Sequence, residues 1–425
     1  MKVNMSVDVH HLTRVEGHGN IHVRIEDGVL LDARWDVVET PRYFEVMLEG
    51  KSYQSAGLLT SRICGICSIG HCLASVRATE NAFGIEPPEL AAKLRLLAKH
   101  GETLQSHALH LFFLVAPDFL QVPSVLPLLK TRPELVNIAR NLKGLANRLC
   151  DLVAGRTTHP ICIQVGGVTR RPDRAKLRAM RPEFVAALDD LVQTAELFKT
   201  FSIPDFSRET EFVSLKAETN YPWIGGRLVS SDGVSRSERA YQAMTNEYVD
   251  KSNTSKWCKL SRDSFAVGAL ARFNNNHHWL HPEARQIARS LGLEPICHNP
   301  YMNNVAQLVE CVHVVHESTS LIDEILEMPD DAPLRAEVSP RASEGVAAVE
   351  VPRGILYHHF RYDDEGRIVA ANCVIPTTQN NANIHIDLEA LVKQFMGLGV
   401  DDEKLELLCS MLVRAYDPCI SCSVH

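Results

Sequence analysis

The chain has 425 residues, of which 45% are hydrophobic and 23% are charged, a composition typical of folded proteins with a large core. Lys and Arg number 44 against 52 Asp and Glu, so the formal charge is -8 and no basic block is long enough to follow a phosphate backbone. The most apolar short run, residues 111–116, is far below the roughly 20 residues of a membrane-spanning helix. Charged residues interrupt 1–19, so we expect no signal peptide. These features exclude nucleic-acid binding and direct membrane insertion.

Strand patterns come first along the chain. Apolar and polar residues nearly alternate over 21–39 around Asp27-Gly28, which predicts an antiparallel hairpin within an N-terminal β region of about residues 1–60. Helical spacing follows Pro87-Pro88, and we expect a helical bundle over about residues 87–330. Its later helices are predicted over 133–153, 181–200, 281–291 and 301–328.

Strand patterns return near the end of the chain. Residues 350–376 read as strands on either side of a polar turn, within a C-terminal β region and tail of about 345–425. No repeat, low-complexity tract or flexible linker interrupts the sequence. We therefore predict a single α+β domain over 1–425, with a large central helical bundle and peripheral antiparallel β elements.

The 12 cysteines are too sparse for a disulfide scaffold, and a reducing compartment is expected. Half of them stand alone among apolar residues and are interpreted as small buried side chains: Cys150, Cys162, Cys258, Cys297, Cys311 and Cys409. The others lie in or near two Cys-x-x-Cys motifs, apart from Cys373. These motifs carry the chemistry of the sequence.

The first motif is Arg62-Ile63-Cys64-Gly65-Ile66-Cys67, followed by His71, and the second is Asp417-Pro418-Cys419-Ile420-Ser421-Cys422, followed by His425. A gap of two residues lets both thiolates of a pair converge on one metal. Two pairs supply four soft ligands, the set expected for Zn, an Fe–S cluster or Ni.

Spacing alone leaves a structural zinc site with four cysteine ligands open. The two pairs lie at opposite ends of the chain, however, whereas structural zinc motifs usually close a short loop. The flanking Arg62, Asp417 and His425 also add polar groups that a closed zinc site does not require. A buried, reactive metal is the better interpretation.

The two motifs resemble the signatures of the large subunit of NiFe-hydrogenases, Arg-x-Cys-Gly-x-Cys and Asp-Pro-Cys-x-x-Cys-x-x-His. Further segments agree in order along nearly the whole chain: Arg14-Val15-Glu16-Gly17-His18, Pro41-Arg42-Tyr43-Phe44-Glu45, Gln105-Ser106-His107-Ala108-Leu109-His110, Val351-Pro352-Arg353-Gly354 and Val374-Ile375-Pro376-Thr377-Thr378. The resemblance implies a catalytic subunit that cleaves H2 heterolytically and reversibly into protons and electrons.

The resemblance also implies a ligand for each metal. Cys64 and Cys419 would be terminal Ni ligands, and Cys67 and Cys422 would bridge Ni to an Fe that carries CO and cyanide. Soft thiolates suit Ni. Cys419 would accept the first proton and Glu16 would carry it onward, although an isolated Glu is ordinarily a solvated or capping carboxylate.

Four further residues gain roles from the same resemblance. Arg353 would donate to one cyanide and polarise the site, and the Thr377 hydroxyl would bind the other. Glu45, His425 and the backbone carbonyl of Cys373 would hold a second cation, Mg or occasionally Fe, because carboxylate, carbonyl and water suit a hard ion.

The remaining histidines have two interpretations. His71, His107 and His110 either take part in the chemistry or are hydrogen-bonded core residues. The pairs His277-His278 and His358-His359 are interpreted as structural or surface residues. The end of the chain at His425 resembles the mature form that the family produces by removing a C-terminal tail.

Ser106 stands where the exported branch of the family usually has Asp, so the chain resembles the cytoplasmic branch, which couples H2 to NAD(P), a deazaflavin or heterodisulfide reduction. The sequence has neither a Cys-x-x-Cys-x-x-Cys run nor a Gly-x-Gly-x-x-Gly loop, so electrons must leave through a partner. The resemblance implies an Fe–S small subunit, with flavin-binding, NAD(P)-binding or heterodisulfide-reductase subunits beyond it. The alternatives are a zinc-stapled assembly protein and a quinone-site subunit related to complex I.

Overall fold

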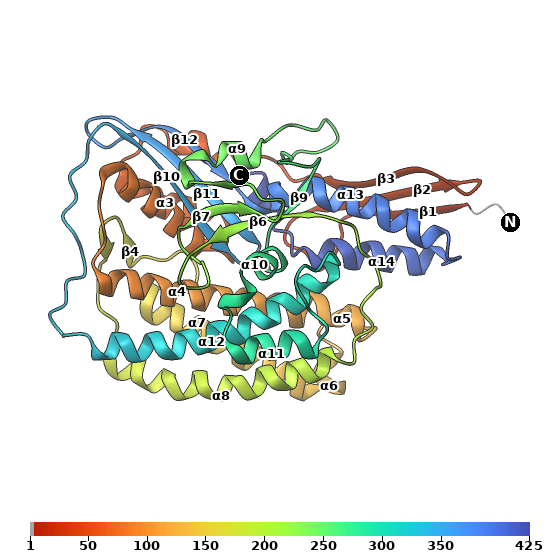
Figure 1. Cartoon of the computed structure of the whole chain (residues 1–425), viewed down its shortest axis with the longest axis horizontal. Helices are drawn as coiled ribbons and strands as arrows, with labels where there is room; N and C mark the ends of the chain where they lie inside the picture. The colour runs from red at the N-terminus through yellow and green to blue at the C-terminus, as the bar shows by residue number, and fades with distance from the viewer. Residues whose placement is uncertain (1–3) are drawn as a thin grey trace.

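Long helices and small antiparallel sheets make up the computed structural model, which describes residues 4–425 (Figure 1). The first sheet has the order β1 (Met5–Val9), β2 (Gly19–Glu26) and β3 (Val29–Val37). Asp27 and Gly28 join β2 to β3 with φ of 51° and 76°, the left-handed conformations of a tight hairpin turn. The predicted hairpin is therefore confirmed, and β1 is a strand that the sequence pattern did not indicate.

The helices form the larger part of the molecule, with α4, α7, α8, α11 and α12 together in the lower part of Figure 1. Their bounds are α1 (Phe44–Leu48), α2 (Tyr53–Thr60), α3 (Ser68–Phe83), α4 (Glu89–Leu109), α5 (Ala116–Phe119), α6 (Leu128–Thr131), α7 (Pro133–Ala154), α8 (Arg174–Phe198), α9 (Gln242–Thr245), α10 (Ala269–Asn276), α11 (Pro282–Ser290), α12 (Asn303–Glu327), α13 (Pro376–Met396), α14 (Asp402–Ala415) and α15 (Ile420–Ser423). The 3-10 helices are η1 (Ser61–Ile63), η3 (Glu238–Ala240), η4 (His277–Trp279) and η5 (Pro300–Met302), and η2 (His110–Val115) is a π-helix.

Three further sheets complete the fold. One of them consists of β10 (Ser343–Val351), β11 (Gly354–Tyr362) and β12 (Ile368–Val374), which are antiparallel in that order. The other two sheets contain β4 (Ile163–Gln164) with β5 (Gly167–Val168), and β8 (Ser235–Arg236), β7 (Arg227–Ser230), β6 (Glu211–Lys216) and β9 (Phe265–Ala266). The predicted α+β class with helices at the centre and peripheral antiparallel strands is confirmed.

Several element boundaries differ from the predictions. Helix α8 begins at Arg174, seven residues before the predicted start, because the Asp173 side chain accepts hydrogen bonds from the backbone N–H groups of Ala175 and Lys176. Helices α3, α13 and α14 lie outside the predicted bundle range. Both α3 and α13 bury polar side chains on most sides, so neither shows the one-sided apolar pattern by which an amphipathic helix is recognised.

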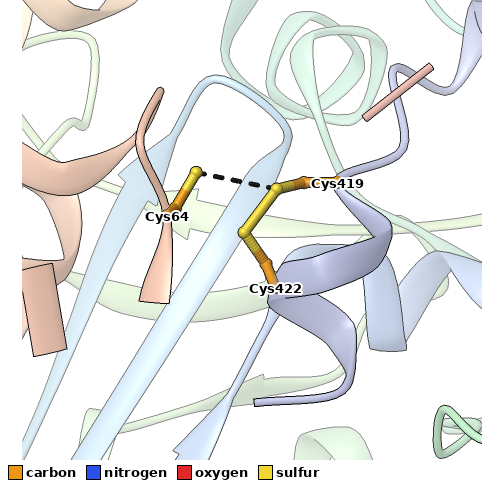
Figure 2. A group of neighbouring side chains, drawn as sticks. All are labelled: Cys64, Cys419 and Cys422. Carbon is orange, nitrogen blue, oxygen red and sulfur yellow. Dashed lines mark hydrogen bonds between the residues drawn. A yellow bond between two sulfur atoms is a disulfide. The ribbon is translucent and has the colours of Figure 1, made fainter. Parts of the chain in front are cut away.

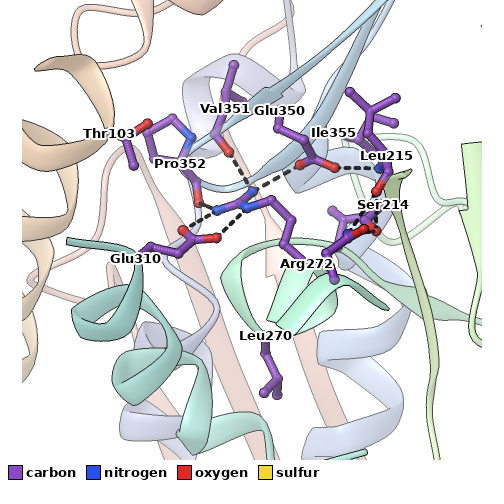
Figure 3. Close-up of polar contacts among 12 residues, drawn as sticks. Thr103, Ser214, Leu215, Leu270, Arg272, Glu310, Glu350, Val351, Pro352 and Ile355 are labelled. Carbon is purple, nitrogen blue, oxygen red and sulfur yellow. Dashed lines mark hydrogen bonds and ion pairs between the residues drawn. The ribbon is translucent and has the colours of Figure 1, made fainter. Parts of the chain in front are cut away.

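A buried ion cluster fixes the turn between β10 and β11. Arg272, on α10, pairs with Glu310 at 2.6 Å and with Glu350 at 3.0 Å, and all three side chains are at most 1% exposed (Figure 3). The same guanidinium donates to the carbonyl oxygens of Val351 at 2.9 Å and Pro352 at 3.2 Å. Arg272 therefore holds the two residues that precede Arg353.

Within residues 4–425, no helix is both long and apolar enough to cross a bilayer.

Candidate metal centre

The two Cys-x-x-Cys motifs meet in the folded chain. Cys64 follows η1 and Cys67 lies directly before α3, whereas Cys419 precedes the short α15 and Cys422 lies within it. The sulfurs of Cys64 and Cys419, 355 residues apart in sequence, are separated by 3.6 Å (Figure 2). All four cysteines are buried. The convergence predicted from the sequence is therefore present in the structure.

The sulfurs form two overlapping groups. Cys64, Cys419 and Cys422 have sulfurs within 4.8 Å of one another, and Cys67, His71 and Cys422 form a second group by the same measure. Cys419 and Cys422 are joined as a disulfide, with Cα atoms 5.4 Å apart (Figure 2). Binding a metal through all four sulfurs requires these two residues in the reduced, thiolate form.

Within the first cysteine pair, Cys64 is the residue prepared to carry negative charge, whereas its hydrogen bond to Cys64 and burial raise the pKa of Cys67. The backbone N–H groups of Ile66 and Cys67 point at the Cys64 sulfur at 3.3 and 3.2 Å. Hydrogen bonding from the Cys67 thiol, together with the Arg353 charge, lowers the pKa of Cys64 although burial opposes it. A lowered pKa favours the thiolate, which is the form that ligates metals.

Glu16 and Arg42, from the N-terminal part of the chain, hydrogen-bond to the second motif. The backbone of Glu16 forms a parallel bridge with Cys419, and the N–H of Ile420 donates to the Glu16 carbonyl at 2.9 Å. Arg42 connects the two motifs, because its Nη2 donates to the carbonyl oxygens of both Ile63 and Ser421. Arg42 lies in a segment that carries the family resemblance, but nothing in that segment indicated this role.

The Glu16 side chain lies beside the second motif. Its carboxylate accepts hydrogen bonds from the Ser421 hydroxyl and, at 3.1 Å, from the Ser421 backbone N–H. The residue is half-buried. Glu16 therefore binds Ser421, which is next to Cys422 and two residues from Cys419 in the sequence. The role of Glu16 as a proton carrier stays a prediction.

Arg353 is buried against the loop before Cys419. Its Nε donates to the Asp417 carbonyl oxygen at 2.8 Å, and Nη2 donates to the Asp417 carboxylate at 2.9 Å. Burial lowers the pKa of Arg353, but the charges of Asp417 and of the Cys67 and Cys64 thiolates outweigh burial and raise that pKa. Nη1 is buried and has no hydrogen-bond partner among residues 4–425. A donor is thus left available within the centre.

Thr377 lies in the first turn of α13 and is 1% exposed. Its hydroxyl oxygen accepts a hydrogen bond from the backbone N–H of Cys419 at 2.9 Å. The O–H proton of the same group remains free to donate. Thr377 therefore positions Cys419 directly, whatever else it binds.

The residues predicted to hold a second cation also come together. His425 Nε2 lies 3.6 Å from a Glu45 oxygen, and the same oxygen accepts from the Cys373 backbone N–H at 2.7 Å. The His425 side chain is 6% exposed. Burial raises the pKa of Glu45, but His425 and the Cys373 N–H outweigh burial, so that pKa is lowered and the carboxylate form is favoured.

Glu247 and Lys256 join this second group and were missed by sequence analysis. Lys256 Nζ lies 3.2 Å from one Glu247 oxygen, and its charge also acts to lower the pKa of Glu45. The other oxygen of Glu247 is buried without a hydrogen-bond partner among residues 4–425. Neither residue lies in a segment that carried the family resemblance, so no local signal identified them.

The three histidines with two interpretations, His71, His107 and His110, have different surroundings in the structure. His71 Nδ1 lies 3.3 Å from His358, and a ring nitrogen of His71 lies within 4.8 Å of the Cys67 and Cys422 sulfurs, which places His71 at the centre. His110 contacts Gln307 at 2.6 Å, while His107 contacts Glu310 of the ion cluster at 2.8 Å. His107 is thus a hydrogen-bonded core residue, as one of the two interpretations held.

Comparison with known proteins agrees with this arrangement. The family described as "Nickel-dependent hydrogenase" matches residues 42–136 and 210–425. Sulfhydrogenase 2 subunit alpha of Pyrococcus furiosus is 32% identical, with 99% of each chain covered. NAD-reducing hydrogenase HoxS subunit beta of Cupriavidus necator is 28% identical, over 97% of this chain and 93% of the relative.

A solved structure extends the likeness to the whole fold. The crystal structure of an NAD+-reducing [NiFe]-hydrogenase in the H2-reduced state has a TM-score of 0.90 and 27% identity, with 99% of each chain covered. The chain belongs to the nickel-dependent hydrogenase family, whose members are oxidoreductases that act on H2. The family and the activity predicted from the sequence are confirmed.

The residues of the centre fit the Ni and Fe that this family uses. Four buried sulfurs form a soft donor set, and Arg353 Nη1 offers an unpaired donor beside them. The second group fits a hard cation, because it offers the Glu45 carboxylate, the His425 imidazole and a buried Glu247 oxygen without a hydrogen-bond partner among residues 4–425.

Proposed function

We propose that Cys64, Cys67, Cys419 and Cys422 hold the Ni–Fe site of a hydrogenase large subunit, with CO and cyanide on the Fe. The observation that carries this proposal is the 3.6 Å approach of Cys64 to Cys419 across 355 residues of sequence, in a buried group with Cys67 and Cys422. When bound, the metal pair polarises H2 and takes up its electrons.

The chain's own residues then handle the proton. Cys419 is the first acceptor, and its backbone is positioned by the N–H bond to Thr377 and by the parallel bridge to Glu16. Glu16 receives the proton next. Its carboxylate accepts a hydrogen bond from the hydroxyl of Ser421, which lies in the same motif as Cys419. Arg353 places a permanent positive charge and one free donor at the centre. Thr377 contributes the second donor, for the other cyanide.

Glu45, His425 and the carbonyl of Cys373 hold a second cation, Mg or Fe. The support is the contact of both side chains near Cys373 and the uncompensated oxygen of Glu247. Mg retains several waters when it binds few carboxylates, and such waters would hydrogen-bond the Glu247 oxygen. The cation would tie the end of the chain to α1 and β12.

Electrons leave through an Fe–S small subunit, with flavin-binding, NAD(P)-binding or heterodisulfide-reductase subunits as further partners in the cytoplasm. The support is the likeness to an NAD-reducing hydrogenase and the commitment of both Cys-x-x-Cys motifs to the centre. Native purification should bring down at least one Fe–S protein in equimolar amount. Reduction of NAD(P) by H2 with the isolated chain would contradict this proposal.

The test of the metal assignment is replacement of each of the four cysteines by Ser. Each variant should lose H2 turnover and most of its Ni, and the infrared CO and cyanide bands should disappear with the Ni. Cys297→Ser is the matched control, because Cys297 is a half-buried cysteine outside the centre. Full Ni content and activity in any of the four variants, or one Zn without Ni in the unmodified protein, would overturn the assignment.

A further inference from the structure

A second group of metal-ligating side chains lies where α11 begins beside α12, and it shares no residue with the cysteine centre. His281 precedes α11, Glu283 lies in its first turn, and His316 lies on α12. One ligand atom from each residue lies within 4.8 Å of the others. The two helices pack against each other, as Figure 1 shows.

The three side chains contact one another closely. His316 Nε2 lies 2.7 Å from a Glu283 oxygen, and the imidazole rings of His281 and His316 are stacked with centroids 3.6 Å apart. Two protonated imidazoles would repel at this separation.

A second row of buried side chains supports the first. The backbone N–H of His281 donates to His313 Nδ1 at 3.1 Å. His313 and His100 are 2% and 1% exposed, and their Nε2 atoms lie 3.3 and 3.2 Å from one Glu317 oxygen. These contacts fix the start of α11 relative to α12 and so hold His281 beside His316 before any ion binds.

A surface groove of about 700 Å³ runs past both rows of side chains. Its walls include His281, His316 and His313, together with the apolar Leu96 and Trp279. The His316 and Glu283 side chains are 22% and 41% exposed, so an ion can reach them from solvent.

We propose that His281, Glu283 and His316 bind one divalent cation of borderline hardness, with Zn2+ as the expected ion, and that this ion links α11 to α12. Two imidazoles and one carboxylate form a donor set that Zn2+ binds with water as its fourth ligand. The ion takes the place of the direct contact between His316 Nε2 and the Glu283 carboxylate.

The experiment uses the purified Ni-loaded protein with its native partners. It is treated with a chelator that leaves Ni in place, dialysed against buffered Zn2+, and analysed by mass spectrometry for Zn and Ni. The expected result is one additional Zn per chain, with X-ray absorption that shows only N and O ligands at about 2.0–2.2 Å. His316→Ala and Glu283→Gln should both lose this Zn and keep their Ni.

His278→Ala is the matched control, because it removes an exposed histidine close to the site and should keep the Zn. Glu283→Gln preserves the shape of the side chain, so loss of Zn from this variant with normal Ni content separates ligation from misfolding. Sulfur ligands at about 2.3 Å would assign the Zn to the cysteine centre and overturn the proposal. Absence of Zn uptake, or Zn retained by both variants, would also overturn it, leaving an ordinary ion pair between Glu283 and His316.

Discussion

Arg353 donates two hydrogen bonds to Asp417, from Nε to the backbone carbonyl oxygen at 2.8 Å and from Nη2 to the carboxylate at 2.9 Å. Asp417 itself has a φ of 51°, a left-handed conformation that few residues other than Gly adopt without support. The arginine therefore holds in place the turn from which Cys419 enters the centre. The third guanidinium nitrogen is left to act on whatever the cysteines bind.

Arg353→Lys should lower H2 turnover by about 100-fold or more, with most of the Ni retained. A lysine ammonium carries the charge but cannot span both Asp417 acceptors and keep the remaining donor in position, and loss of one such donor commonly costs this much. H2-dependent dye reduction and Ni analysis measure the two effects. Arg367→Lys, at an exposed ion pair with Glu365, should leave both values unchanged. Normal turnover in Arg353→Lys would remove the guanidinium from the chemistry.

Glu16→Gln should keep the normal metal content while H/D exchange and H2 oxidation fall together, by about 100-fold or more. The amide preserves the size of the side chain and its contact with Ser421 but cannot carry a proton. Glu26→Gln, at a 52% exposed carboxylate, is the control. Exchange kinetics equal to those of the unmodified protein would exclude Glu16 from proton transfer.

Glu310→Gln should destabilise the fold by about 3–5 kcal/mol, because it leaves the buried Arg272 charge with only Glu350 as its partner. Urea unfolding of the protein measures this difference. Glu324→Gln removes a carboxylate that is 52% exposed and paired with Lys93, and should change stability by less than about 1 kcal/mol. Equal effects of the two substitutions would show that burial of the cluster does not matter.

The free energy of unfolding should decrease as the pH is lowered, in part because of His358. Burial lowers the pKa of His358 from its ordinary value of 6.5 to about 3, and its ring contacts Ser75 at 2.8 Å. Between pH 6.5 and about 3, therefore, His358 is protonated in the unfolded chain but remains neutral in the folded chain. The contribution of His358 is complete above pH 6.5 and is lost as pH falls toward 3, by about 1.4 kcal/mol per pH unit.

His358→Gln should flatten this dependence, as measured by unfolding at a series of pH values. The substitution changes overall stability as well, so the slope and not the midpoint is compared. His10→Gln, at a histidine that is 66% exposed, should leave the slope unchanged. An unaltered slope in His358→Gln would assign the acid sensitivity to other groups.

Sequence analysis predicted the cysteine convergence because two thiolate pairs have few purposes other than a shared metal. It predicted the β2–β3 hairpin because Asp27-Gly28 is a strong local turn signal. It did not find α13, whose buried Thr377, Asn380 and Asn381 look like a surface segment when read without their partners. Burial of polar residues depends on contacts made across the whole chain, and periodicity within one helix does not report them.

The supporting residues of the site were hidden for the same reason. Glu247 pairs with Lys256, and the Lys256 charge acts on Glu45, from a part of the sequence with no recognisable motif. His281 and His316 are 35 positions apart and meet only because α11 folds back along α12. Roles within a motif follow from residue type and spacing, whereas roles created by tertiary contact need the fold.

The approach of Cys64 to Cys419 also sets an order for biosynthesis. A growing chain on the ribosome presents Cys64 and Cys67 long before the segment that carries Cys419 exists, with 355 residues between the two sulfurs that end in contact. Glu16 and Arg42 must likewise wait for that segment, because their hydrogen bonds to it close the same long loop. Completion of the centre is therefore a late event in the folding of the chain.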